Sequence, residues 1–240
     1  MISPENIIEI NKQFQNLEPR DILQRVLAEF SNVTVSFSGA EDVALVMMAW
    51  KLKKDIKIFT LDTGRLHPET YRFIDTVSKE FDLDLDILYP DTSAIEKLTS
   101  AKGLFSFYQD GHEECCSIRK TEPLRRKLAS VDVWITGQRK DQSPTRTDVP
   151  IAQVDTTFAA PGKTLLKFNP LANWRSKDVW DYIRIFELPY NPLHDQGFVS
   201  IGCEPCTRPI GPHQHEREGR WWWEDATAKE CGLHRINIIE

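Results

Sequence analysis

The chain has 240 residues, of which 40% are hydrophobic and 28% are charged, and its formal net charge is −6 at pH 7. These values are ordinary for a globular protein and give no support to nucleic-acid binding, and no apolar run is long enough to span a membrane. An oxidisable set of cysteines without an apolar signal segment at the start predicts a cytoplasmic protein with neither nucleic-acid nor membrane partners.

The chain begins with two short predicted helices, because apolar residues recur at helical spacing across residues 5–30. We expect both helices to pack against a larger domain that follows them. The boundaries that we infer are N-terminal helices at 1–30, an α/β domain at 31–212 and a C-terminal tail at 213–240.

A predicted strand at Val33–Phe37 runs through a short loop, 38–42, into a helix that starts at Val43. A strand, a tight glycine turn and a helix start expose backbone N–H groups that can hold an anion or a nucleotide. The loop resembles the Ser-Gly-Gly-x-Asp-Ser loop of the PP-loop ATP pyrophosphatases, but Ala40 and Val43 replace its second glycine and its last serine. The departure argues against pyrophosphate handling and leaves adenylate binding open.

The alternation of strand and helix continues with a strand at Ile56–Leu61, a helix at 67–81 and a strand at Leu83–Leu88. This order predicts a single Rossmann-like α/β domain with a mostly parallel sheet and ligands at the carboxyl ends of the strands. The loops 36–42 and 62–65 would then lie at the same edge, although Asp62 could instead cap the next turn.

Four of the five cysteines form two close pairs, Cys115-Cys116 and Cys203-Glu-Pro-Cys206. Tetrahedral sulfur ligation is typical of zinc or of an iron–sulfur cluster. Adjacent thiolates can each bind a different iron of a cluster, which favours iron–sulfur over zinc. The alternative is a set of core or disulfide-bonded cysteines, but core cysteines have no reason to occur in pairs flanked by charged residues.

Residues 114–128 predict a helix with a kink at Pro123. In such a helix Cys116 and Lys120 lie on one face, as do Cys115 and Arg119. The two cations would offset the net charge of about −2 that four thiolates give to a [4Fe–4S]²⁺ core. The alternative is that both cations belong to a solvated face.

A further predicted strand, Val131–Thr136, leads into the loop 137–146, which carries three cations within eight residues and suits an anionic ligand. Residues 151–168 predict a hairpin-like pair of strands that turns at Pro161-Gly162. Ser176 would cap a helix at 177–187.

The tail contains two arginines, Arg217 and Arg220, which share one face of any helical turn and could hold an anion. The following Trp221–Trp223 could pack in the core or cover a site against water. The nearby His213 and His215 could add metal ligands, which four thiolates make unnecessary.

Cys231 is the one cysteine outside the two pairs, and Lys229 and His234 flank it and could lower its pKa towards the thiolate. The alternative is an incidental surface thiol. If Cys231 attacks a substrate and keeps part of it covalently, no internal thiol is free to resolve the adduct. An external dithiol would then have to do so by exchange.

Taken together, these residues resemble the assimilatory sulfonucleotide reductases, specifically the cluster-bearing adenylylsulfate (APS) reductases. The resemblance extends from about Ser31 to His234. The matching motifs are Ser36–Asp42, Leu61–His67, Cys115-Cys116 with Arg119-Lys120, Gly137–Arg139 with Ser143–Arg146, Cys203–Arg208, Arg217–Trp223 and Glu230–His234.

The resemblance implies an adenine nucleotide alpha hydrolase-like, PP-loop-related fold with a C-terminal tail that carries the nucleophile. It implies that Cys231 attacks the sulfate sulfur of adenylylsulfate, releases AMP and keeps a Cys-S-sulfonate (thiosulfonate). Thioredoxin or glutaredoxin would then release sulfite, in assimilatory sulfate reduction and cysteine biosynthesis.

The resemblance also implies roles for individual residues. A [4Fe–4S] cluster would be held by Cys115, Cys116, Cys203 and Cys206, and Lys120 would couple its field to the substrate sulfate. Phosphate and sulfate would be held by Arg146, Arg217 and Arg220. The adenosine pocket would be lined by Ser36, Phe37, Ser38, Asp62 and Gly137, and His234 would lie near the nucleophile.

Three alternatives stay open at this point, as does assembly into a homo-oligomer. The first is the same reaction on phosphoadenylylsulfate (PAPS) or on both nucleotides, and the 3′-phosphate of PAPS needs further cations such as Arg65 or Lys140. The second is tRNA thiolation by a PP-loop enzyme, against which the altered 38–43 loop and the acidic charge argue. The third is a nucleotide sensor with a redox cluster, which would bind nucleotide without turnover.

Overall fold

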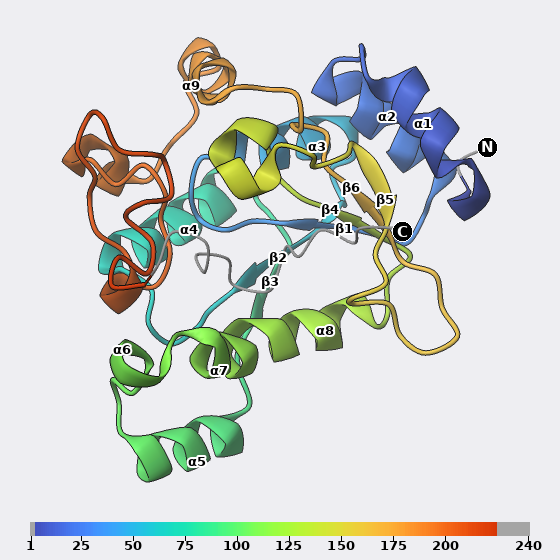
Figure 1. Ribbon diagram of the computed structural model, residues 1–240. Helices are drawn as coiled ribbons and strands as arrows, with labels where there is room; N and C mark the ends of the chain where they lie inside the picture. Colours follow the sequence, from blue (N-terminus) through green and yellow to red (C-terminus); the bar gives the residue numbers. More distant parts are fainter. Residues whose placement is uncertain (1–2, 225–240) are drawn as a thin grey trace.

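The computed structural model describes residues 3–224, and it contains one six-stranded sheet with the order β3-β2-β1-β4-β6-β5 (Figure 1). Four of its pairings are parallel, and β5 runs antiparallel to β6. The predicted mostly parallel α/β domain is confirmed, and so is the predicted pair of strands within 151–168. The strands are β1 (Val33–Ser36), β2 (Lys57–Leu61), β3 (Leu85–Leu88), β4 (Val133–Ile135), β5 (Ala152–Val154) and β6 (Leu166–Phe168).

Helices cover both faces of the sheet. The larger core joins one face to five helices: α1 (Ile7–Phe14), α2 (Pro19–Glu29), α3 (Val43–Leu52), α4 (Pro68–Glu80) and α9 (Ser176–Ile185). A smaller core joins the other face to α8 (Glu122–Leu128), and the short helices α5 (Thr92–Lys102), α6 (Phe107–Asp110) and α7 (Glu113–Cys116) continue on that side (Figure 1). In the described residues no helix is long and apolar enough to cross a membrane.

The N-terminal helices pack on the domain, as their apolar spacing predicts. Ile10 and Phe14 of α1 are buried in the larger core. The side chain of Asn11 donates to the Ala152 carbonyl at 2.7 Å and accepts from its N–H at 3.0 Å. Because Ala152 starts the edge strand β5, the amide occupies backbone groups that another strand could otherwise pair with.

The predicted helix at 114–128 is continuous in direction but not in hydrogen bonding. A π-helical segment, Ser117–Thr121, separates α7 from α8. Pro123 is the second residue of α8 and follows the last residue of the π-helical segment by two positions. A proline disturbs the helical turn that precedes it, so the irregular segment lies where Pro123 acts, and the kink itself stays a prediction.

The cap of α9 also differs from the prediction. Arg175 is the N-cap, and its backbone N–H donates to the Asp178 carboxylate at 2.8 Å, while Ser176 is the first helical residue. The Asp178 carboxylate, three residues into the helix, therefore accepts from the backbone N–H of the N-cap residue, as in a capping box.

The sheet order places a switch point between β1 and β4. From β1 the chain proceeds outward to β2 and β3, whereas β4 is followed on its other side by β6 and β5. The loops that leave the carboxyl ends of β1 and β4 diverge there, which opens a crevice at that edge.

Candidate functional site

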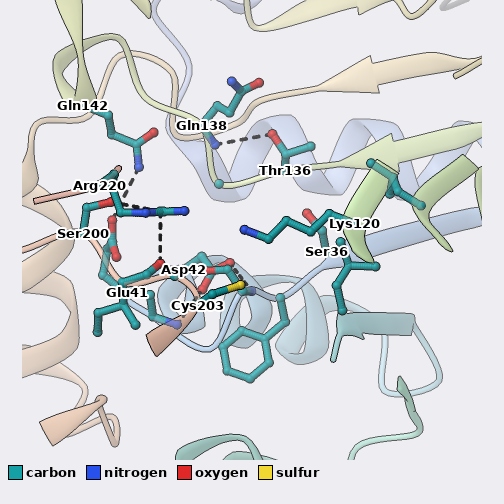
Figure 2. Close-up of a pocket in the computed structure, with 18 of the residues that line it drawn as sticks. Ser36, Glu41, Asp42, Lys120, Thr136, Gln138, Gln142, Ser200, Cys203 and Arg220 are labelled. Carbon is teal, nitrogen blue, oxygen red and sulfur yellow. Dashed lines mark hydrogen bonds between the residues drawn. The ribbon is translucent and has the colours of Figure 1, made fainter. Parts of the chain in front are cut away.

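A cavity of about 190 Å³ occupies the crevice beyond β1 and β4. Its walls include the loop after β1, β2 with the loop that follows it, the loop after β4, and the segment 200–220. A further wall is formed by the π-helical segment through Lys120, whose ammonium reaches into the cavity (Figure 2). The site therefore joins segments that are far apart in the sequence.

The four residues predicted for the adenosine pocket at the carboxyl ends of β1 and β4 all line this cavity: Ser36, Phe37, Ser38 and Gly137. A Cβ at Gly137 would stand 2.9 Å from the Cβ of Asp42. Glycine is needed at this position because the two loops approach more closely than a side chain allows. The Asp42 carboxylate in turn accepts from the Ser38 N–H at 2.6 Å and orders the β1 loop.

Four basic side chains line the same cavity: Lys120, Arg146, Arg217 and Arg220. Figure 2 shows Lys120 and Arg220 extending towards each other from opposite walls. Arg220 donates to the Ser200 hydroxyl at 3.4 Å and to the Ile201 carbonyl at 3.3 Å. These acceptors are neutral, so the positive charge of Arg220 remains available to an anion in the cavity.

Trp221 is a fully buried neighbour of three of these cations. Its ring lies 4.6 Å from the Arg220 guanidinium and 5.8 Å from both the Lys120 ammonium and the Arg217 guanidinium. His112 stacks on the indole at a centroid distance of 4.1 Å. Of the two roles left open for the tryptophan run, packing is the one that the structure assigns to Trp221.

The four paired cysteines line a second, narrower cavity next to the first. Cys115 and Cys116 come from α7, and the other pair comes from the turn Cys203–Cys206. The turn is held by a hydrogen bond from the Glu204 N–H to the Arg65 carbonyl at 2.8 Å, and by one from the Trp221 N–H to the Cys206 carbonyl at 3.0 Å. The structure thus brings both pairs to one place.

Lys120 and Cys203 are the two residues that line both cavities. The Lys120 side chain hydrogen-bonds the Cys203 sulfur, and the Thr63 hydroxyl lies 3.2 Å from the same sulfur. Burial opposes ionisation of Cys203, but Lys120, Thr63 and Arg220 outweigh it and hold the pKa of this thiol below its ordinary value. Burial and the neighbouring Cys203 raise the pKa of Cys206 to about 12.

Arg119 and Lys120 are buried, so the interpretation of these cations as a solvated face is wrong. Arg119 lines the cysteine cavity, and its guanidinium donates to the Thr63 carbonyl at 2.6 Å. Arg119 and Lys120 line the cysteine cavity together with Cys115 and Cys116, and Lys120 also contacts Cys203 of the distant cysteine pair. Two buried cations beside four thiols fit the charge of a thiolate-bound cluster.

Asp62 does not line the 190 Å³ cavity. Its carboxylate accepts from the Gly64 N–H at 2.7 Å and from the Tyr71 hydroxyl at 2.7 Å. It faces a separate hollow between α4 and β3. The alternative that Asp62 caps the next turn is the one that the structure supports.

The cations of the loop 137–146 are used in three different ways. Arg146 lines the cavity, whereas the exposed Lys140 donates to the Asn173 side chain at 2.7 Å. Arg139 is buried and pairs with three carboxylates, Glu41 at 3.0 Å, Asp141 at 3.1 Å and Glu216 at 3.0 Å. Of the three cations of this loop, Arg146 alone lines the cavity, and its contact with an anionic ligand stays a prediction.

The carboxylates around Arg139 are not indicated by any pattern in the sequence. Glu41 and Glu216 lie 98 and 77 residues from Arg139 along the chain, so no local spacing indicates the network. Burial and the charge of Glu41 raise the pKa of Glu216 to about 8. The network ties the loop after β1, the loop after β4 and the segment before Arg217 to one another.

Two further predicted residues, Cys231 and His234, lie outside the described residues. Arg65, considered above as a partner for a 3′-phosphate, lines the cysteine cavity and donates to the Leu104 carbonyl. Neither Arg65 nor Lys140 is part of the wall of the larger cavity.

Comparison with solved structures shows the fold. A phosphoadenylyl-sulfate (PAPS) reductase from Candida auris, in a phosphate complex, matches with a TM-score of 0.72 and 26% identity, over 87% of this chain and 98% of that one. An FMN adenylyltransferase from Candida glabrata matches with a TM-score of 0.57 over 96% of this chain and 79% of its own. At 16% identity this second likeness concerns the fold alone.

Comparison of sequences shows the family. A family model described as the phosphoadenosine phosphosulfate reductase domain matches residues 32–209. The chain is 57% identical to an adenosine 5′-phosphosulfate reductase of Pseudomonas aeruginosa (strain LESB58), over all of this chain and 90% of that protein. It is 51% identical to 5′-adenylylsulfate reductase 3, chloroplastic, of Arabidopsis thaliana, over all of this chain and 54% of the relative. The chain therefore belongs to the PAPS/APS reductase family, among its adenosine 5′-phosphosulfate reductases.

Proposed function

We propose that this protein reduces adenylylsulfate to sulfite and AMP with electrons from a thioredoxin-type dithiol, as a step of sulfate assimilation. The observation that carries the proposal is the cavity at the switch point, which joins two nucleotide-type loops to four basic side chains. An adenosine group would occupy the end formed by the loops after β1 and β4. The phosphate and the sulfate would then lie among Lys120, Arg146, Arg217 and Arg220.

The covalent step is assigned to Cys231. Its thiolate sulfur forms a bond to the sulfate sulfur, and the bond from that sulfur to the bridging oxygen breaks. The bridging oxygen leaves with the electron pair as part of AMP, and the SO₃ group stays on Cys231 as a thiosulfonate. Basic groups that hold the departing phosphate stabilise the charge that develops on it.

The second step regenerates the thiol. A thiolate of the external dithiol attacks the Cys231 sulfur, and sulfite leaves with the electron pair of the sulfur–sulfur bond. The second thiol of the same partner then resolves the mixed disulfide. The sulfur of the substrate gains two electrons, and the dithiol becomes a disulfide, so the electrons balance.

The donor set at the second cavity fits an iron–sulfur cluster. Four cysteines converge there, and the buried Arg119 and Lys120 supply positive charge beside them. We assign Cys115, Cys116, Cys203 and Cys206 as ligands of a [4Fe–4S] cluster. When bound, the cluster would supply a fixed charge behind Lys120, because the dithiol already provides both electrons.

Adenylylsulfate is favoured over PAPS by the positions of two cations. A 3′-phosphate needs charge at the ribose end of the cavity, and Arg65 and Lys140 point elsewhere. We therefore expect kcat/KM for adenylylsulfate to exceed that for PAPS by at least tenfold at equal thioredoxin.

The test is turnover with each nucleotide. AMP and sulfite would be measured after anaerobic incubation with thioredoxin and either adenylylsulfate or PAPS, for the native protein and for Cys231→Ser. The proposal predicts turnover of adenylylsulfate by the native protein, and nucleotide binding without turnover by Cys231→Ser. Binding without turnover by the native protein would instead support the sensor alternative.

A further inference from the structure

The described surface beside the cysteine cavity exposes a group of large apolar side chains. Leu104 and Phe105 precede α6, Tyr108 lies within it, and Trp222 comes from the segment that follows the second cysteine pair. Their exposed fractions are 61%, 58%, 40% and 42%, in that order. The Tyr108 ring lies 6.3 Å from both the Phe105 ring and the Trp222 ring, so the group forms one surface, which we call the aromatic patch.

Two rings of the aromatic patch, Tyr108 and Trp222, are fixed by contacts with neighbouring residues. The Tyr108 hydroxyl donates to the Pro205 carbonyl at 2.7 Å, inside the turn of the second cysteine pair. Trp223 packs edge-on against Tyr108 at 4.5 Å, and the Arg208 guanidinium lies 5.0 Å from the Trp222 ring. Aromatic side chains that are already fixed lose little conformational entropy when a partner covers them.

We propose that the aromatic patch is the docking surface for the protein dithiol that reduces the Cys231 thiosulfonate, an inference that rests on the proposed function. The first argument is the distance that the chain can span between Glu224 and Cys231. Cys231 follows Glu224, the last described residue, by seven positions, and an extended chain of that length spans roughly 24 Å. A partner that must attack Cys231 has to bind within that radius, and Trp222 stands two residues before Glu224.

The second argument is size. With about 200 Å² for each large side chain, the exposed fractions correspond to a patch of roughly 400 Å². A stable dimer buries about 800 Å² on each partner, whereas transient redox encounters use smaller areas. The aromatic patch therefore fits a partner that binds, exchanges a disulfide and leaves, rather than a second copy of this chain.

The test separates docking from chemistry by forming the thiosulfonate first. The native protein, the Leu104→Ser/Phe105→Ser variant and an Ile8→Ser/Ile185→Ser control would be loaded with adenylylsulfate without reductant, and the adduct checked by intact mass. Ile8 and Ile185 are also large exposed apolar side chains, more exposed than Leu104 and Phe105, but they lie on α1 and α9, across the sheet from α6 (Figure 1). Sulfite release would then be followed against the concentration of thioredoxin and, separately, of dithiothreitol.

We expect the patch variant to need about tenfold more thioredoxin for the half-maximal rate, since truncating two exposed anchors removes part of a small interface. Its rate with dithiothreitol should equal that of the native protein, and the control should match the native protein with both reductants. Equal thioredoxin dependence in all three proteins, or an equal loss with dithiothreitol, would overturn the docking surface alone. If the patch variant forms a smaller oligomer than the native protein does, the aromatic patch is instead an interface between copies of this chain. Absence of an adduct on the native protein would overturn the proposed function and the docking surface together.

Discussion

The buried cations at this crevice form two groups, which differ in whether carboxylates pair with them. Arg139, which does not line the cavity, pairs with the carboxylates of Glu41, Asp141 and Glu216. Lys120 and Arg220 line the cavity itself and extend towards each other (Figure 2). Burial and charge are alike in the two groups, so neither property distinguishes a structural cation from a ligand-binding one. The distinction comes from the positions of the negative partners.

The largest effect is expected from removal of Arg139, the cation that pairs with carboxylates. Arg139→Ala leaves three carboxylates close together without their cation, and removal of one partner of a buried ionic network costs about 3–5 kcal/mol. We expect the free energy of unfolding to fall by that amount in urea denaturation. Lys140→Ala, on the same loop but exposed, should stay within about 0.5 kcal/mol of the native protein. Equal losses in the two variants would contradict the assignment of Arg139 as a structural cation.

Substitution of Lys120 should lower catalytic efficiency rather than destabilise the loop after β4. Lys120→Ala removes the one cation that borders both cavities, and we expect kcat/KM for adenylylsulfate to fall by about 10²–10³. Lys120→Arg, which keeps the charge, should recover part of that loss. Iron and sulfide content would be measured alongside, because a variant that merely loses its cluster would show the same fall in rate with less iron.

Arg220→Ala should have a smaller effect, because three other basic side chains line the same cavity. We expect kcat/KM to fall by roughly tenfold to a hundredfold, mostly through KM for adenylylsulfate. The matched control is Arg184→Ala, an exposed arginine at the end of α9, which should leave both constants unchanged. A loss of stability comparable to that of Arg139→Ala would place Arg220 in the structural group instead.

The smallest effect concerns the carboxyl group that orders the β1 loop. Burial and the neighbouring Glu41 raise the pKa of Asp42 to about 7. The folded state therefore holds this proton more tightly than the unfolded state does, and its contribution to the free energy of unfolding falls as pH rises from about 4 through 7. Asp42→Asn should remove that dependence, so that the variant gains about 1.3 kcal/mol relative to the native protein between pH 5 and pH 6. Parallel stability curves would show that Asp42 titrates normally.

The sequence predicted the parts of this site that depend on local patterns. The loops after β1 and β4 follow from runs of β-branched and apolar residues, and parallel strands place their carboxyl ends at one edge. The convergence of the two cysteine pairs was expected because paired thiols indicate a shared ligand. The π-helical segment at Ser117–Thr121 was not predicted, because a single wider turn leaves no mark on apolar spacing.

The sequence could not distinguish the two groups of cations. Arg139 and Arg146 have the same chemistry and lie in one loop, but the carboxylates that pair with Arg139 come from distant parts of the chain. The family resemblance implied that Asp62 lines the adenosine pocket. In the structure its oxygen is occupied by Gly64 and Tyr71, which belong to the turn and to α4. Contacts of this kind depend on tertiary packing and have no sequence signature.

The most direct test of the account is the mass of the protein after exposure to nucleotide without a reductant. Anaerobically purified protein would be mixed with adenylylsulfate, or separately with PAPS, and examined by intact and peptide mass spectrometry. The account predicts one added SO₃ group on Cys231 with adenylylsulfate and little or none with PAPS. Equal adducts with both nucleotides would contradict the inferred substrate preference. No adduct with either nucleotide, in protein that retains its iron, would contradict the covalent mechanism itself.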